Sequence, residues 1–203
     1  IAQEREADEV EPGGQVIIAG HGRFGGIVNQ MLRSVGFKTT ALDYSAAQLD
    51  MLRSYGLRAF FGDATRPDLL HAAGIAEAKV FVVALDEKEA TTELVRYVCA
   101  NYPRVHVLAR AKDRTHVYEL WAAGCRDIIR ETFDSSVRAG RSAYEALGIH
   151  PFEAEQMARV FVQQDQVAMR ELAGLYDSNV PHSENIPYRE RATSVHLTRD
   201  LTA

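Results

Sequence analysis

The sequence predicts an α/β fold, a doubly wound parallel sheet followed by a C-terminal helical extension. Short apolar runs, typical of buried parallel strands, alternate with segments of helical periodicity over residues 14–130. Glycine stands where several of these helices are expected to stop, at Gly36, Gly56, Gly74 and Gly124. Strands that alternate with helices form βαβ units, and such units build a parallel sheet covered on both faces.

Each element has its own local signal. The expected strands are 15–20, 37–42, 58–61, 79–85, 105–109 and 125–129. The first helix carries Ile27, Met31 and Val35 at helical spacing. The expected starts of the later helices are a capping box at 45–48, Thr65 ahead of Pro67, Asp86 with Glu89, and Asp113.

Outside this region the chain changes character. Residues 1–13 are charged and precede a Gly-rich stretch, which is typical of a linker in a longer polypeptide. Over 131–176 two helices are expected, as an extension for dimerisation and regulation. The first has a narrow apolar stripe that either packs back on the sheet domain or forms a dimer surface. The stripe consists of Phe133, Val137, Gly140, Tyr144 and Leu147. Residues 177–203 are predicted to be a polar, loosely held tail.

Composition excludes several classes of protein. The 203 residues are 46% hydrophobic and 25% charged, the mix of a globular chain with a core, and the net charge is −5. An acidic domain is a poor candidate for nucleic-acid binding, so no nucleic-acid partner is expected. No apolar run approaches the ~18–20 residues of a membrane span. Cys99 and Cys125 lack CxxC or His partners, which indicates neither a metal site nor a disulfide and favours a reducing cytoplasm.

The motif that indicates chemistry is Gly20-His21-Gly22-Arg23-Phe24-Gly25, a GxGxxG sequence between a predicted strand and a predicted helix. In this Rossmann-like context the glycines allow a tight turn, close approach of a phosphate, and packing of helix on strand. The N-terminus of the helix then offers free N–H groups to the anion.

Asp43 lies 23 residues after Gly20, at the end of the second strand, where a carboxylate binds ribose hydroxyls. No Lys or Arg follows closely, which favours AMP or NAD(H) over NADP. Asp63 ends the third strand and either binds the nucleotide or forms a turn. Arg23 either reaches a pyrophosphate or is solvated. The predicted cofactor-binding residues are Gly20, His21, Gly22, Arg23, Phe24, Gly25, Asp43, Tyr44, Asp63, Ala64, Thr65 and Arg110.

Catalytic residues do not emerge from the sequence. No tyrosine is followed four residues later by the lysine of a short-chain dehydrogenase, and the histidines show no HxxxH or HExxH spacing. A nucleotide site without a catalytic apparatus favours a sensor over an enzyme.

Several motifs in order resemble one family, the KTN or RCK (TrkA-N type) regulatory domains of Kef glutathione-gated potassium efflux antiporters. The resemblance covers about residues 15–175. Its motifs are residues 16–25, 42–43, 61–66, 108–113 and 130–133.

This resemblance implies a regulatory domain at the cytoplasmic face of the bacterial inner membrane. Such domains form a homodimer, are joined to the membrane antiporter domain of the same polypeptide, and bind AMP or NAD(H) in the glycine cleft. Glutathione near the dimer interface keeps potassium efflux closed, and its adducts open it. Residue by residue, Arg130 matches an arginine that binds glutathione carboxylate.

Three further positions follow from the resemblance. Asp165 stands where better-known members have a glutathione-binding Asn, and Gln30 where they have an Arg, so both depart from the family pattern. Tyr55 matches an aromatic gating residue. From the residues alone, Tyr55 is equally explained by packing at a helix end, and Arg130 by a structural pair with Glu131 or Asp134.

Two other functions stay open. One is an NAD-binding regulatory subunit of a Trk-type potassium uptake system, which usually has a β-rich domain after the sheet; no alternating strands follow residue 130. The other is an NAD-dependent oxidoreductase, disfavoured by the missing catalytic residues.

Overall fold

The computed structural model describes residues 15–43, 45–181 and 183–201. The expected linker 1–13 and Tyr44 therefore lie outside the described residues. The chain divides into two compact units. The first unit comprises the residues up to Arg110 together with Ala123–Ile129, and the second comprises Ala111–Ala122 together with the residues from Arg130 onward.

A six-stranded sheet of the predicted class is present, with the strand order β3-β2-β1-β4-β5-β6. β1 pairs in parallel with both β2 and β4, and the pairs β2–β3 and β4–β5 are also parallel. The order reverses between β1 and β4, which is the point where open α/β sheets bind ligands. The strands are β1 Val16–Ala19, β2 Thr39–Asp43, β3 Arg58–Phe61, β4 Val80–Val83, β5 His106–Ala111 and β6 Asp127–Arg130.

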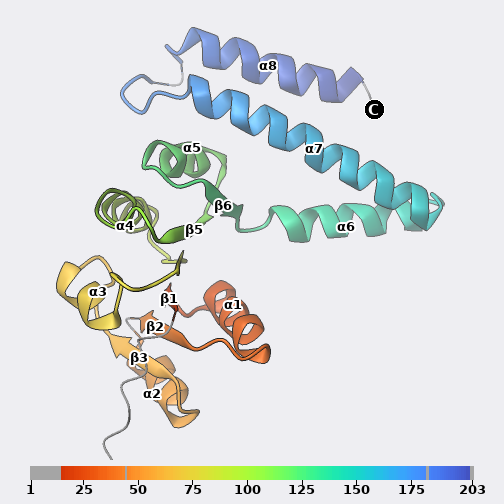
Figure 1. Ribbon diagram of the computed structural model, residues 1–203. Helices are drawn as coiled ribbons and strands as arrows, with labels where there is room; N and C mark the ends of the chain where they lie inside the picture. The colour runs from red at the N-terminus through yellow and green to blue at the C-terminus, as the bar shows by residue number, and fades with distance from the viewer. Residues whose placement is uncertain (1–14, 44, 182, 202–203) are drawn as a thin grey trace, which may run out of the picture. The chain divides into compact units, whose positions relative to one another are not determined.

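Helices connect the strands and continue beyond the last one (Figure 1). No helix among the described residues is both long and apolar enough to cross a membrane. The helices of the first unit are α1 Arg23–Ser34, α2 Ala46–Ser54, α3 Pro67–Ala73 and α4 Lys88–Asn101. Those of the second unit are α5 Arg114–Ala122, α6 Phe133–Ala146, α7 Pro151–Leu175 and α8 Ile186–Leu201.

Helix α1 packs on one face of the sheet through Phe24, Val28 and Leu32, which contact a cluster that includes the buried Ile18 and Val82. Since side chains alternate along a strand, the neighbouring Ile17 and Phe81 point to the opposite face. Both are fully buried, so the central strands are covered on both sides. This is why β1 and β4 are apolar without interruption.

Two predicted helix caps are wrong. Thr65 does not cap α3, because Arg66 is the N-cap and the Thr65 hydroxyl donates to Asp63 at 2.6 Å. Asp86 does not cap α4 either: Glu87 is the N-cap, and Asp86 forms an ion pair with Arg110 at 3.4 Å. Thr65 thus bonds within its own loop, whereas Asp86 pairs with a residue of β5. By contrast, Asp113 accepts the His116 N–H at 2.8 Å, as expected of a residue that starts α5.

The expectation of a loosely held tail is wrong for the last helix. α8 runs antiparallel beside α7 (Figure 1), and its Tyr188 and Ala192 pack on a buried cluster of Tyr118, Met169 and Leu172. Tyr118 belongs to α5, so α5 joins α7 and α8 in the second unit. The sequence predicted that all of residues 14–130 form one domain, whereas Ala111–Ala122 belong to the second unit.

Candidate functional site

A cavity of about 640 Å³ lies at the carboxyl edge of the sheet in the first unit. Its size is that of a small-molecule site. Its lining comes from the ends of the first four strands and the segments that follow them. β1, β2 and β3 lie on one side of the point where the strand order reverses, and β4 lies on the other. The lining residues are Gly20, Gly22, Leu42, Asp43, Ser45, Gly62, Asp63, Ala64, Thr65, Ala84, Leu85, Asp86, Glu87, Ala90 and Glu93.

The glycines of the motif meet distinct constraints. Gly20 has φ +91°, and a Cβ on it would lie 2.3 Å from the Ala84 carbonyl oxygen. A Cβ on Gly25 would lie 2.0 Å from the Gly20 carbonyl oxygen, so helix and loop are in backbone contact there. Gly22 is the N-cap of α1 and faces open space. The first N–H groups of α1 are therefore accessible to an anion beside Gly22.

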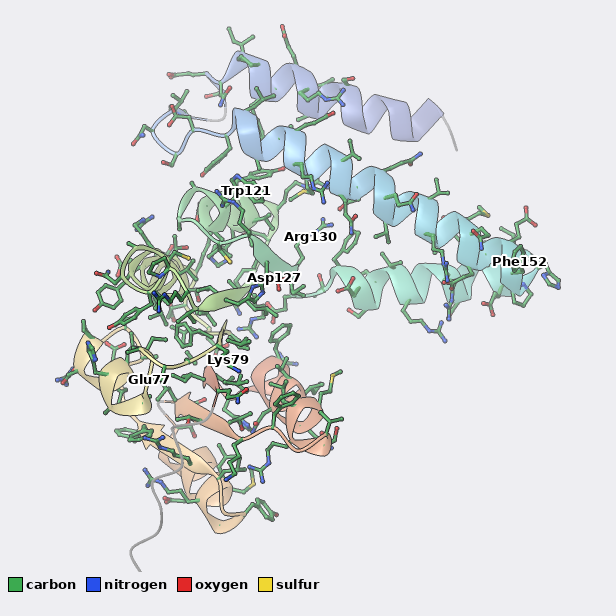
Figure 2. The ribbon with its side chains drawn as sticks, in the orientation of Figure 1. Glu77, Lys79, Trp121, Asp127, Arg130 and Phe152 are labelled. Atoms are coloured by element: carbon green, nitrogen blue, oxygen red, sulfur yellow. The ribbon has the colours of Figure 1, made fainter. Side chains whose placement is uncertain are left out.

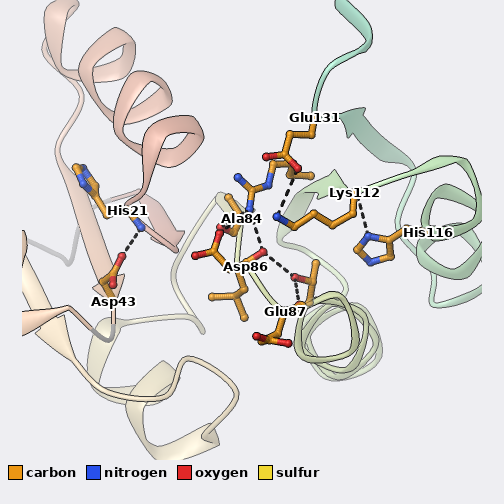
Figure 3. A network of polar contacts seen from close by, with 11 residues as sticks. His21, Asp43, Ala84, Asp86, Glu87, Lys112, His116 and Glu131 are labelled. Carbon is orange, nitrogen blue, oxygen red and sulfur yellow. Dashed lines mark hydrogen bonds and ion pairs between the residues drawn. The ribbon is translucent and has the colours of Figure 1, made fainter.

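Asp43 is held by two backbone donors. One carboxylate oxygen accepts the His21 N–H at 2.6 Å (Figure 3). The other accepts the Ser45 N–H at 2.8 Å. The glycine loop and the end of β2 are thereby joined through one side chain. Each carboxylate oxygen retains acceptor capacity for a further hydrogen bond, such as one from a ribose hydroxyl.

The side chain of His21 turns away from the cavity and toward α1 (Figure 3). Its Nε2 lies 2.9 Å from the amide nitrogen of Asn29, and the Thr39 hydroxyl donates to the amide oxygen of Asn29. Asn29 and Thr39 are both buried. Burial lowers the pKa of His21, which keeps the ring neutral.

Arg110 supports the wall of the cavity from behind. Its guanidinium is 5% exposed and donates to the carbonyl oxygens of Ala84 and Leu85 at 3.2 and 3.0 Å. It also lies 5.6 Å above the ring of Phe24. Arg110 therefore fixes the loop after β4 but is not among the residues that line the cavity.

The predicted nucleotide residues thus fall into two groups. Those that line the cavity are Gly20, Gly22, Asp43, Asp63, Ala64 and Thr65. His21, Arg23, Phe24, Gly25 and Arg110 do not line it, although all but the exposed Arg23 shape or brace the loops around it. The sequence predicted none of the residues that form the wall after β4, which are Ala84, Leu85, Asp86, Glu87, Ala90 and Glu93. This wall follows β4, which lies next to β1 in the sheet. The order of the strands was not predicted from the sequence, so this segment could not be placed beside the glycine loop.

A second polar cluster lies in the second unit. Arg130 points toward α7 (Figure 2) and forms an ion pair with Asp165, whose side chain is 1% exposed. Arg114 lies 3.6 Å from the other carboxylate oxygen of Asp165. The Arg130 guanidinium also stacks 3.6 Å above the ring of Phe133.

This geometry corrects the structural alternative for Arg130. The expected partners were Glu131 or Asp134, but Arg130 pairs with Asp165, 35 residues away in the chain. Glu131 instead lies 3.4 Å from the amine of Lys112 (Figure 3). Asp165 is thus a buried counter-ion to two arginines, and its carboxylate is turned away from solvent.

The two remaining predicted residues are exposed in the first unit. Gln30 lies on the outer surface of α1. Tyr55 follows α2 and is 71% exposed, so the alternative that it packs at the helix end within this chain is wrong. Both side chains are available to a partner or ligand.

Comparison with known proteins agrees with this architecture. Residues 16–131 match the TrkA-N domain, and residues 135–191 match the potassium efflux system KefB C-terminal domain. The glutathione-regulated potassium-efflux system protein KefC of Cronobacter sakazakii is 43% identical over 172 residues. That match covers 84% of this chain and 28% of the relative. KefC of Escherichia coli is 43% identical over 158 residues, or 77% of this chain and 26% of the relative. The chain thus spans about a quarter of the length of these relatives.

Solved structures show the same fold. The Shewanella denitrificans Kef C-terminal domain in AMP-bound form is 41% identical, with a TM-score of 0.73 over 79% of this chain and 99% of that one. The TrkA-N domain of the Escherichia coli inner membrane protein ybaL is 22% identical. Its TM-score is 0.60, with 68% of this chain and 99% of that one covered, and this likeness concerns the fold alone. The two family models together span residues 16–131 and 135–191, and the chain belongs to the TrkA-N domain family as a KTN/RCK-type domain of the Kef kind.

Proposed function

We propose that this chain is the ligand-sensing regulatory domain of a Kef-type potassium/proton antiporter, at the cytoplasmic face of the bacterial inner membrane. It binds AMP or NAD(H) in the cavity beside Gly22 and is not an enzyme. Glutathione or its adducts bind around Arg130 near a dimer interface, and this binding gates potassium efflux through the membrane domain of the same polypeptide.

The observation that carries the nucleotide site is the placement of Asp43. Its carboxylate lines the cavity together with Gly20 and Gly22, and two backbone N–H groups hold it in place before any ligand arrives. A relative with 41% identity has been solved in AMP-bound form. A preorganised acceptor opposite the open N-terminus of α1 suits a nucleotide with a free ribose and a phosphate.

Replacing Asp43 tests this site. We expect Asp43→Ala to weaken AMP and NAD by about 1.5–3 kcal/mol, because hydrogen bonds to a charged group are lost. NADP should bind the natural protein more weakly than NAD, since a carboxylate repels the 2′-phosphate. Isothermal titration calorimetry measures both. Asp50→Asn, an exposed carboxylate on α2, is the matched control, and thermal melts establish that both variants fold. AMP binding unchanged in Asp43→Ala would contradict the proposed site.

The glutathione site rests on the cluster around Arg130. A planar guanidinium suits a carboxylate of glutathione, and Phe133 holds it by stacking. Arg130 already forms an ion pair with the buried carboxylate of Asp165. In this chain a glutathione carboxylate must therefore compete with Asp165 for the Arg130 guanidinium. Arg114 supplies a second positive charge at the same place.

Two substitutions separate these roles. Arg130→Ala should abolish glutathione binding and leave AMP binding near that of the natural protein. Asp165→Asn should tighten glutathione binding several-fold, because it removes the competing charge. Arg138→Ala, an exposed arginine on the next helix, is the control. If Arg130→Ala loses both ligands, the two sites are not separate. If it loses neither, Arg130 has only a structural role.

A further inference from the structure

Carboxylates dominate the lining of the nucleotide cavity. Five acidic residues line it, namely Asp43, Asp63, Asp86, Glu87 and Glu93, and none of the described lining residues is a lysine or an arginine. Asp43 accepts the backbone N–H groups of His21 and Ser45, and Asp63 accepts that of Thr65. The other three belong to the loop after β4 and the first turns of α4, and we call Asp86, Glu87 and Glu93 the acidic wall.

One arginine pairs with this wall from behind the loop, and Lys88 follows Glu87 as the first residue of α4. Arg110 meets Asp86 at 3.4 Å, but its guanidinium is directed at the carbonyl oxygens behind the loop. Helix N-termini often bind phosphate groups. In α4, however, the N-cap residue is Glu87, whose carboxylate opposes a phosphate at this position. The N-terminus of α1 beside Gly22 contributes about half a positive charge, enough to favour one phosphate group.

Nucleotides differ in the charge they bring to this cavity. AMP carries about two negative charges at neutral pH. Each further phosphate of ADP or ATP adds roughly one more, and in the same cavity it meets carboxylates instead of cations. In NAD the positive nicotinamide ring offsets part of the pyrophosphate charge. The acidic wall therefore weakens the binding of nucleotides with a longer phosphate chain more than it weakens the binding of AMP and NAD.

From this we infer that the acidic wall selects the nucleotide by charge. Asp86, Glu87 and Glu93 are specificity-determining residues that admit AMP or NAD and exclude ATP. This inference rests on the proposed nucleotide site and adds to it the residues that choose among adenine nucleotides. A domain with this selectivity keeps AMP or NAD bound in the presence of a large excess of ATP.

Calorimetric titration with AMP, ADP and ATP tests the inference, in EDTA so that no divalent cation screens the phosphates. We expect ATP to bind at least tenfold more weakly than AMP, with ADP between them. The difference in affinity between AMP and ATP should become smaller as NaCl is raised from about 0.05 to 0.5 M, because salt screens repulsion between charges.

The decisive variant is the triple substitution Asp86→Asn, Glu87→Gln, Glu93→Gln. It should bring ATP to within about threefold of AMP, and it should strengthen ATP binding much more than AMP binding, because ATP carries more negative charge into the cavity. The control removes equal charge from carboxylates of the same unit that do not line the cavity, by Asp50→Asn, Glu77→Gln and Glu89→Gln. If the triple variant does not fold, Glu93→Gln is compared with Glu89→Gln, one turn earlier on α4.

The outcomes are distinct. If the natural protein binds no nucleotide at all, the proposed function and the charge selection both fail. If AMP binds and ATP binds equally well, only the charge selection fails. If ATP is rejected but the triple variant leaves the gap intact, or the control closes it as well, the acidic wall is not the cause and the inference is overturned.

Discussion

Asn29 forces the ring of His21 into one tautomer. The Thr39 hydroxyl donates to the amide oxygen of Asn29, so the amide N–H group faces Nε2 of His21. Nε2 must then accept, and the ring carries its proton on Nδ1. Hydrogen bonds thus connect Thr39 of β2, Asn29 of α1 and His21 of the glycine loop. The histidine stands at a variable position of GxGxxG, so the motif alone assigns it no role.

This arrangement makes the fold sensitive to acid. The pKa of His21 is lowered by burial in the folded state, so the unfolded chain binds the proton more readily. Stability should therefore fall as the pH drops below the ordinary histidine value of about 6.5. His21→Gln should lose less stability between pH 7.5 and 5.5 than the natural protein does.

Thermal melts across this pH range measure the effect. His71→Gln, an exposed histidine at the end of α3, is the control and should keep the pH dependence of the natural protein. An identical pH profile for His21→Gln and the natural protein would show that His21 is not responsible.

At the scale of elements, the two halves of α7 differ. Its C-terminal half is part of a core, with Leu172 fully buried and Met169 beside Tyr118 of α5. Its N-terminal half buries mainly Ala154 and Ala158, and leaves Val160 and Phe161 half-exposed. Helix α6, the neighbour of this half, has no buried residue. The C-terminal half of α7 therefore belongs to a core shared with α5 and α8, whereas its N-terminal half pairs with α6 and leaves apolar side chains exposed.

The packing of α8 on α7 depends on Tyr188. Its ring lies 5.8 Å from that of Tyr118 and 6.4 Å from that of Tyr176. Because Tyr188 is only half-buried, we expect Tyr188→Ala to cost about 1–3 kcal/mol, below the value for a fully buried aromatic residue. Hydrogen exchange of the α8 amides should accelerate most.

The control for this variant is Ile186→Ala, at the start of the same helix, where the side chain is 59% exposed. Hydrogen exchange in α8 that stays as slow as in the natural protein after Tyr188→Ala would contradict the packing role.

At the scale of the whole molecule, apolar surface remains exposed in each unit. On α1 and at its C-cap, Ile27, Met31 and Val35 are 61%, 68% and 73% exposed and recur every four residues. In the second unit, Leu147 is 82% and Phe152 is 70% exposed. A mostly apolar groove of about 260 Å³ is lined by residues of α6 and α7, namely Phe133, Ser136, Val137, Gly140, Arg141, Tyr144, Ala158 and Phe161. Apolar patches of this kind mark protein interfaces, which supports the proposed homodimer.

Light scattering tests the dimer. The mass of this chain is 22.6 kDa, and at tens of micromolar we expect twice that value. Val137→Asp together with Leu147→Asp places two charges on the α6 stripe and should shift the protein to monomer. Ile186→Asp, on α8, is the control. A monomer mass for the natural protein would refute the dimer.

The sequence by itself determined the sheet, its glycine loop and the acidic residue at the end of β2. The strand at 58–61 begins and ends where predicted, and the others lie within about two residues. These features depend on local patterns, namely apolar runs, glycine stops and the spacing from Gly20 to Asp43. The apolar runs and glycine stops can be recognised within a few residues of chain, and Asp43 lies only one βαβ unit, 23 residues, beyond Gly20.

Tertiary structure decided the rest. The partner of Arg130 is Asp165, 35 residues distant, where local spacing had pointed to Glu131 or Asp134. The acidic wall lines the cavity because β4 lies beside β1, an adjacency that no local pattern encodes. The polar composition from residue 177 onward gave no signal for α8. This helix is stabilised by Tyr188 and Ala192, which pack on residues of α5 and α7. In each case the deciding contact joins segments far apart in the chain, and short-range propensity contains no information about such contacts.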